Sequence, residues 1–162
     1  MDTNRISELQ EIARRVRVGI IDGVFSASSG HPGGSLSIAE IITYLYFEEM
    51  NVDPKNPKKP DRDRFVLSKG HTAPGLYSTL AQRGFFPVED LKTLRKLGSY
   101  LQGHPCMQHI PGVDMSSGSL GQGISGIKAL GFDEVLEVAV GAEMVAYKEG
   151  LELIEKGFLP KE

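Results

Sequence analysis

The stretch Asp63-Arg-Phe-Val-Leu-Ser-Lys-Gly-His-Thr-Ala-Pro74 decides the fold class predicted for this chain. Its centre, Phe65–Leu67, is a short apolar run bounded by charged residues and glycine, which is typical of a buried strand. Pro74 stands where the first turn of a new helix would begin. His71 lies between these two elements, at the carboxyl end of the predicted strand, where open α/β sheets bind their ligands. The stretch therefore predicts an α/β fold with a ligand site at His71.

Helices are predicted on both sides of this stretch, over residues 5–21, about 38–49, 74–84 and 88–98. Each shows the helical spacing of apolar side chains. Ser37 and Glu40 have the spacing of a capping box at the second helix, and glycines stand where the last two helices should end. Only one strand can be located clearly. We therefore predict an α/β chain in which helices surround a small, incomplete parallel sheet.

Residues 98–118 show no helical or strand period. A structureless stretch of this length is uncommon inside a compact domain and is usually functional or disordered. Because it contains Gly103-His-Pro105 and ends at Gly118, we favour a functional segment. The next residues, Gly118-Ser-Leu-Gly-Gln-Gly123, form a Gly-rich turn that opens a helix and can offer backbone N–H groups to a polar ligand. Such turns also serve simply to let helices pack closely.

Three of the four histidines share one local design. Glycine precedes His31, His71 and His104, and proline follows the first and the last of them. A glycine lets the backbone turn sharply before the ring, and a proline stiffens the chain after it. A single loop histidine is more often an ordinary surface residue, as we expect for His109, but three repetitions favour function. Their spacing does not indicate a zinc site, and we assign no metal ligands.

The composition narrows the class of protein. The chain has 162 residues, 40% hydrophobic and 24% charged, with a formal net charge of −3. These values predict a compact globular protein and argue against nucleic acid or an acidic membrane surface as its main partner. The longest apolar stretch, Ile38–Phe47, is too short to span a bilayer. No signal peptide is visible, and the single Cys106 is consistent with a reducing, cytoplasmic location.

Four segments together resemble the transketolase family. They are Ser29-Gly-His-Pro-Gly-Gly-Ser-Leu-Ser-Ile-Ala-Glu40, the 63–74 stretch, the Gly103-His-Pro105 turn and Gly118-Ser-Leu-Gly-Gln-Gly-Ile124. They occur in the order and with the approximate spacing of that family, over about residues 5–127. The chain looks most like the separate N-terminal subunit of a transketolase divided into two chains. The resemblance implies that residues 1–127 are part of a thiamine-diphosphate-binding domain.

The resemblance also implies roles for the matching residues. His71 looks like the residue that hydrogen-bonds the diphosphate of thiamine diphosphate. Gly118, Ser119 and Leu120 resemble the turn that lies against the aminopyrimidine ring. His31 and His104 resemble the catalytic histidines that contact sugar oxygens and help to move protons.

A transketolase transfers a two-carbon ketol unit from a ketose to an aldose phosphate, in the pentose phosphate pathway. The implied partners are sugar phosphates and a C-terminal transketolase chain or domain, in a homo- or hetero-oligomer.

The sequence departs from the family after residue 127. The family holds Mg²⁺ with a Gly-Asp-Gly motif, and the nearest segment here, Gly141-Ala-Glu143, has alanine in place of the aspartate. Residues 128–162 match poorly and are predicted to be a largely helical tail. Two alternatives to a working enzyme component therefore stay open. One is a truncated or rearranged, non-catalytic fragment, and the other is a phosphate-binding module that uses His71 and the Gly118 turn. By itself the chain is expected to show no transketolase activity.

Overall fold

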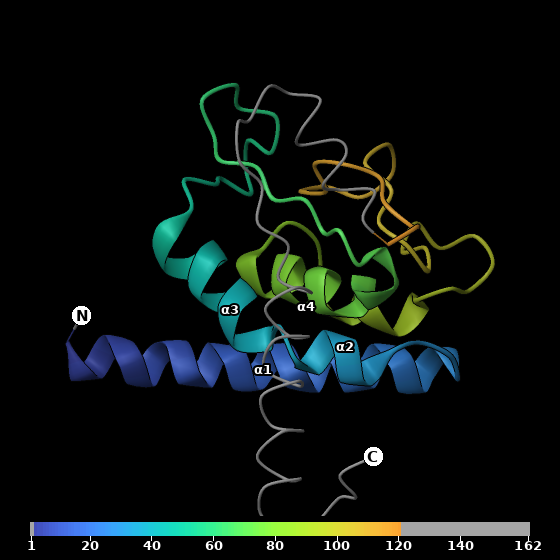
Figure 1. Ribbon diagram of the computed structural model, residues 1–162, viewed down its shortest axis with the longest axis horizontal. Helices are drawn as coiled ribbons and strands as arrows, with labels where there is room; N and C mark the ends of the chain where they lie inside the picture. Colours follow the sequence, from blue (N-terminus) through green and yellow to red (C-terminus); the bar gives the residue numbers. More distant parts are fainter. Residues whose placement is uncertain (1, 121–162) are drawn as a thin grey trace, which may run out of the picture. The chain divides into compact units, whose positions relative to one another are not determined.

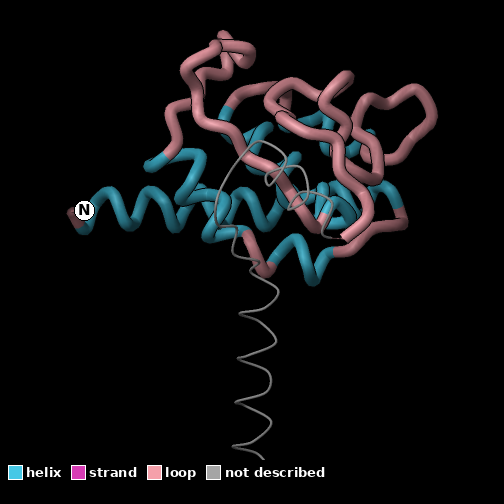
Figure 2. The backbone as a smooth tube through the Cα atoms, turned by 45° about the horizontal axis from the view of Figure 1, so that its top comes forward, coloured by secondary structure: helices cyan, strands magenta, loops and turns pink. Residues whose placement is uncertain are grey.

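The computed structural model describes residues 2–120, which fall within one compact unit, Met1–Gly123. Its helices are α1 (Thr3–Ala27), α2 (Pro32–Leu36), α3 (Ala39–Tyr44), the π-helical turn η1 (Leu45–Glu49), the 3₁₀ turn η2 (Gly70–Thr72), α4 (Ala73–Arg83) and the 3₁₀ turn η3 (Val88–Thr93). Figure 1 shows α1 as a long base on which α2, α3 and α4 lie. In Figure 2 the long loops gather beyond α4, on the side away from α1.

Helix α1 confirms the amphipathic period and extends it at both ends. The Asp2 side chain caps its start by accepting a 2.7 Å hydrogen bond from the backbone N–H of Arg5. The face carrying Ile12, Val16 and Ile20 is buried. At Gly19 the helix meets α4 so closely that an added Cβ would lie 2.3 Å from Ser78 Oγ. The small residue therefore sets how closely the two helices can cross.

The predicted capping box is wrong. Ser37 Oγ donates to the carbonyl of Gly34, 2.9 Å away, and α3 begins only after Ile38. Ser37 has helical backbone angles because it closes α2, so it cannot act as the extended N-cap residue of the next helix. The predicted 38–49 helix is nevertheless present, divided into α3 and the wider turn η1.

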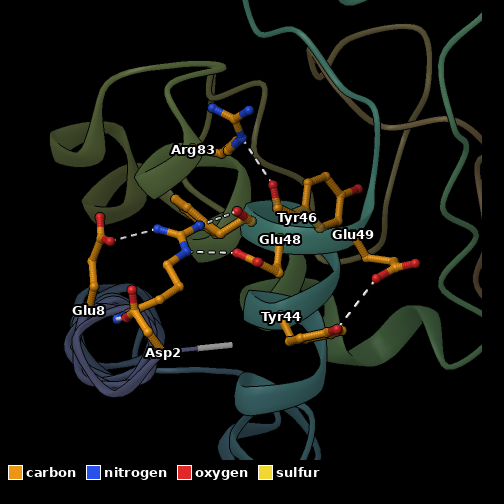
Figure 3. A network of polar contacts seen from close by, with 9 residues as sticks. Asp2, Glu8, Tyr44, Tyr46, Glu48, Glu49 and Arg83 are labelled. Atoms are coloured by element: carbon orange, nitrogen blue, oxygen red, sulfur yellow. Dashed lines mark hydrogen bonds and ion pairs between the residues drawn. The ribbon is translucent and has the colours of Figure 1, made fainter.

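Two arginines bind the carbonyl groups at the end of η1. Arg5 of α1 donates to Phe47 O at 2.6 Å and to Glu48 Oε2 at 2.7 Å. Arg83 of α4 donates to Tyr46 O at 3.0 Å, as Figure 3 shows from close by. Because carbonyls in the last turn of a helix lack intrahelical partners, these bonds satisfy them and connect η1 to two other helices.

Helix α4 forms the centre of the core, as its apolar sequence predicted. Pro74 occupies its first turn, and Gly84 ends it with a φ of 98°. Tyr77 and Leu80 of this helix are completely buried. The predicted 88–98 helix is shorter than expected, because η3 stops at Thr93 and Leu94 leaves helical geometry. Residues 94–120 contain turns and loops, which confirms the predicted lack of period over 98–118.

The prediction of a strand at Phe65–Leu67 is wrong, because residues 2–120 contain helices, turns and loops but no strand. The backbone N–H of Phe65 donates to Asp114 Oδ2 at 2.7 Å, and the carbonyl of Leu67 accepts from Ser117 Oγ at 2.6 Å. A strand requires a ladder of backbone partners. Here the neighbouring segment supplies side chains at these positions, so the run is held without forming a ladder. The predicted tail, residues 128–162, lies outside the described residues.

None of the helices within residues 2–120 has both the length and the apolar character needed to cross a membrane.

Candidate functional site

The loops that carry His31 and His71 lie against each other. His31 is the residue directly before α2, and His71 is in η2, directly before α4. Their rings pack edge to face, with centroids 5.0 Å apart and an angle of 71° between the ring planes. Gly34 permits this contact, since a Cβ at that position would lie 2.6 Å from Thr72 Cγ2. Two residues that are forty positions apart therefore form one site.

The Gly118 turn and His104 complete the same region. The backbone of Gly70, next to His71, packs so tightly on the 117–118 peptide that an added Cβ would lie 2.7 Å from Ser117 O. Gly118 faces the ring of His104: a Cβ added at Gly118 would lie 3.9 Å from His104 Cδ2. The structure thus brings together His31, His71, His104 and Gly118. Ser119 and Leu120 follow in the same turn and are exposed.

A buried tyrosine fixes the backbone of His104. Tyr77 projects from the core helix α4 and donates through its hydroxyl to the carbonyl of His104, 2.8 Å away. Burial raises the pKa of Tyr77, so the hydroxyl stays protonated and available as a donor. The His104 ring itself remains exposed. This arrangement, a rigid backbone below an accessible imidazole, suits a residue that binds a ligand.

Basic groups dominate the electrostatics of the site. Burial lowers the pKa of His71, and the nearby His31, Lys69 and His104 lower it further. Burial also lowers the pKa of Lys69, whose Nζ donates to Gly34 O and Ser37 Oγ at 3.1 Å each. A bound anion would oppose these effects, because a nearby negative charge stabilises the protonated forms of His71 and Lys69. The site is therefore suited to a negatively charged ligand.

Three contributors were missed by sequence reasoning. Lys69 lies inside the 63–74 stretch and could have been noticed, because a cation next to His71 suits an anion. Ser68 Oγ is buried and, within residues 2–120, has no hydrogen-bond partner. Arg95 reaches the site from the end of η3, and no sequence pattern pointed to it. His109, predicted to be an ordinary residue, is exposed in a turn.

No group of three or more His, Cys, Asp and Glu side chains within residues 2–120 could hold a metal ion. The segment Gly141-Ala-Glu143, where the sequence departs from the magnesium motif, lies outside the described residues.

Acid is expected to destabilise the chain through His71. A histidine whose pKa is lower in the folded state binds fewer protons there than in the unfolded state. Its contribution to stability is therefore present above the unfolded pKa of about 6.5 and is lost as the pH falls through the folded pKa. His71→Gln removes this term, so the variant should lose less thermal stability than the parent between neutral and acidic pH. Equal losses in melting curves recorded across that range would contradict the prediction.

The chain is similar to known transketolases. A family model described as "Transketolase, thiamine diphosphate binding domain" matches residues 8–148. The chain is 48% identical, over 118 residues, to a 6-deoxy-6-sulfo-D-fructose transketolase subunit from a Clostridium species, covering 73% of this chain and 43% of that protein. It is 45% identical to one of the subunits of an apulose-4-phosphate transketolase from Phocaeicola vulgatus, and the match covers 73% of this chain and 41% of that subunit. Human transketolase is 42% identical, with coverage of 76% and 20%.

Solved transketolases have the same fold over the described region. One from Pichia stipitis, in complex with sedoheptulose 7-phosphate, superimposes with a TM-score of 0.69 at 44% identity, covering 72% of this chain and 17% of that one. The enzyme from Leishmania mexicana gives 0.69 at 37% identity, covering 72% and 18%. These relatives are α/β proteins, which supports the predicted class. The chain spans about a fifth of the length of human transketolase and less than half of the length of the two relatives named as subunits. By sequence and by structure, it belongs to the transketolase family, in the region of the thiamine-diphosphate-binding N-terminal domain.

Proposed function

We propose that this chain is the N-terminal component of a transketolase, which transfers a two-carbon ketol unit from a ketose to an aldose phosphate. The observation that supports this most directly is the convergence of His31 before α2, His71 before α4, and His104 and Gly118 in the irregular stretch 94–120. These are the positions at which the sequence resembles the transketolase site. Chance would not be expected to place four such segments together.

The residues present are compatible with thiamine diphosphate. His71, the amino group of Lys69 and backbone N–H groups near Gly118 would hold its diphosphate, because an anion opposes the effects of burial and of neighbouring basic groups that lower the pKa of His71. The buried Ser68 hydroxyl can donate a hydrogen bond nearby. Gly118, Ser119 and Leu120 would lie against the aminopyrimidine ring. When bound, thiamine diphosphate supplies the carbanion chemistry that carries a two-carbon unit between sugars.

His31 and His104 are assigned to the sugar substrates. Both side chains are exposed, on loops held against His71 and Gly118 respectively. A neutral imidazole can donate one hydrogen bond and accept another, so each ring can orient a hydroxyl group. Each can also take a proton from a sugar oxygen or return it. The sedoheptulose 7-phosphate complex of the Pichia stipitis relative supports sugar phosphates as the substrate class.

The activity is assigned to an assembly. Two of the relatives are named as transketolase subunits, which supports a C-terminal transketolase chain as the partner, in a hetero- or homo-oligomer. Mg²⁺ is expected for the family, but no residue of this chain is assigned to bind it. We keep residues 1–127 as the cofactor domain and 128–162 as a separate tail, although the family match extends to residue 148. A cytoplasmic location is retained on the basis of the single Cys106.

Removing the His71 imidazole is expected to weaken thiamine diphosphate binding without unfolding the chain. A hydrogen bond to a charged group contributes about 1.5–3 kcal/mol, so His71→Ala should lower affinity by roughly 10- to 150-fold. Calorimetric titration in the presence of Mg²⁺, with and without a C-terminal transketolase chain, measures the effect. His109→Ala is the matched control and should leave affinity unchanged.

Equal affinity in the parent and in His71→Ala would contradict the assignment of His71. If the parent bound no cofactor even with a C-terminal chain present, the non-catalytic fragment would be the better description.

A further inference from the structure

Arg95 has an unusual backbone conformation that no part of the proposed chemistry explains. Its φ is +59°, in the left-handed region that side chains other than glycine rarely adopt. The conformation is held by a 2.9 Å hydrogen bond from its own N–H to the carbonyl of Leu101. Gly98, three residues later, also has a positive φ. The loop after η3 thus keeps an arginine at a position where glycine would be free of strain.

The strained backbone directs the guanidinium between two histidine loops. Arg95 Nη1 donates to Ser29 Oγ, 2.5 Å away and two residues before His31. On its other side the guanidinium lies on Gly103, the residue directly before His104. A Cβ at Gly103 would lie 2.6 Å from Arg95 Nε and 2.8 Å from Nη2. Glycine at this position is therefore what allows the arginine head to approach.

His104 is consequently held from two directions. Tyr77 fixes its carbonyl from the buried side, and Arg95 covers the preceding peptide from the solvent side. His31 is held by α2, where buried Ser35 donates to its carbonyl at 3.0 Å. The bond from Arg95 to Ser29 connects these two separately anchored loops. An arginine suits this position, because the face of its planar guanidinium can pack on a glycine while an N–H group in the plane donates to a hydroxyl.

We propose that Arg95 is a positioning residue, which sets the separation of the His31 and His104 loops by bonding Ser29 while resting on Gly103. We assign it no direct role in binding cofactor or sugar; it acts through the two histidine segments that it contacts. The inference rests on the proposed function, which assigns both histidines to the sugar substrates.

The first test is Arg95→Gly in the full 162-residue chain. Glycine accepts the positive φ without strain, so the unfolding midpoint should stay close to that of the parent. The four histidines give a simple readout in long-range ¹H–¹⁵N spectra of their imidazoles. Signals of His31 and His104 should shift, and that of His109 should not. Lys96→Gly, which removes the adjacent exposed cation, is the matched control and should shift neither histidine.

The second test is a double-mutant cycle with Gly103→Ala. The added methyl group displaces a flexible guanidinium, not the backbone, so the fold is retained. Gly103→Ala alone should shift the same two histidine signals as Arg95→Gly. In the Arg95→Gly background it should produce little further shift, because there is no guanidinium left to displace.

Three outcomes would overturn the proposal. They are unchanged His31 and His104 signals in Arg95→Gly, equal effects of Gly103→Ala in both backgrounds, and a lower unfolding midpoint accompanied by shifts of all four histidines, which is the mark of a merely structural residue. The spectra are recorded without cofactor. Their result is therefore independent of the thiamine diphosphate titration, and either proposal can fail alone.

Discussion

Asp114→Ala is expected to lower the free energy of unfolding by about 3–5 kcal/mol, the usual cost of breaking a buried ion pair. The side chain of Asp114 is 4% exposed, and that of its partner Arg62 is 11% exposed. The same carboxylate accepts the backbone N–H of Phe65 at 2.7 Å. Alanine would therefore leave a largely buried guanidinium and a half-buried amide without this acceptor. Since small domains have about 5–15 kcal/mol of stability in total, the loss is a large part of it.

Chemical denaturation of three variants measures this prediction. Asp114→Asn should be less severe than alanine, because an amide oxygen can still accept from Phe65 N–H although it no longer neutralises Arg62. Asp61→Ala is the surface control. Its carboxylate pairs with Lys59 at 3.1 Å while 66% exposed, and exposed pairs contribute about 0–1 kcal/mol. Similar losses of unfolding free energy in Asp61→Ala and Asp114→Ala would show that the Arg62–Asp114 pair contributes no more to stability than an exposed pair.

Gly70→Ala is expected to have the second-largest effect and to damage the site together with the fold. The added Cβ would lie 2.7 Å from Ser117 O and 2.9 Å from Gly118 N. Both are backbone atoms, so a whole loop must move instead of a side-chain end. Overpacking of this kind costs about 1–3 kcal/mol. It should also separate His71 from the Gly118 turn and thereby weaken thiamine diphosphate binding.

Gly33→Ala is a closely matched control, because the same change is made in the neighbouring helix α2. Gly33 lies in α2, and an added Cβ there has no atom within 4 Å. Alanine is better than glycine inside a helix by about 0.5–1 kcal/mol, so this variant should be neutral or slightly more stable. Thermal unfolding and cofactor titration of both variants give the answer. A Gly70→Ala chain with the stability and affinity of Gly33→Ala would refute the tight loop contact.

The sequence alone determined the helices and the family. The regular spacing of Ile12, Val16 and Ile20 predicted α1, and Pro74 and Gly84 marked the ends of α4, because these signals are local and act within one or two turns. The Gly-His pairs at His31, His71 and His104 indicate the candidate site from the sequence alone. The local capping rule failed at Ser37, since that residue was already used to close the preceding helix.

The tertiary structure decided how Phe65–Leu67 is held and which other residues support the histidines. An apolar run is compatible with any buried extended segment. Whether it forms a strand depends on whether the neighbouring segment offers backbone or side-chain groups as hydrogen-bond partners. Here the partners are the side chains of Asp114 and Ser117, about fifty residues away. Arg95 likewise meets Ser29 across 66 residues. Such contacts depend on loop packing between distant segments, which leaves no period or motif in the sequence.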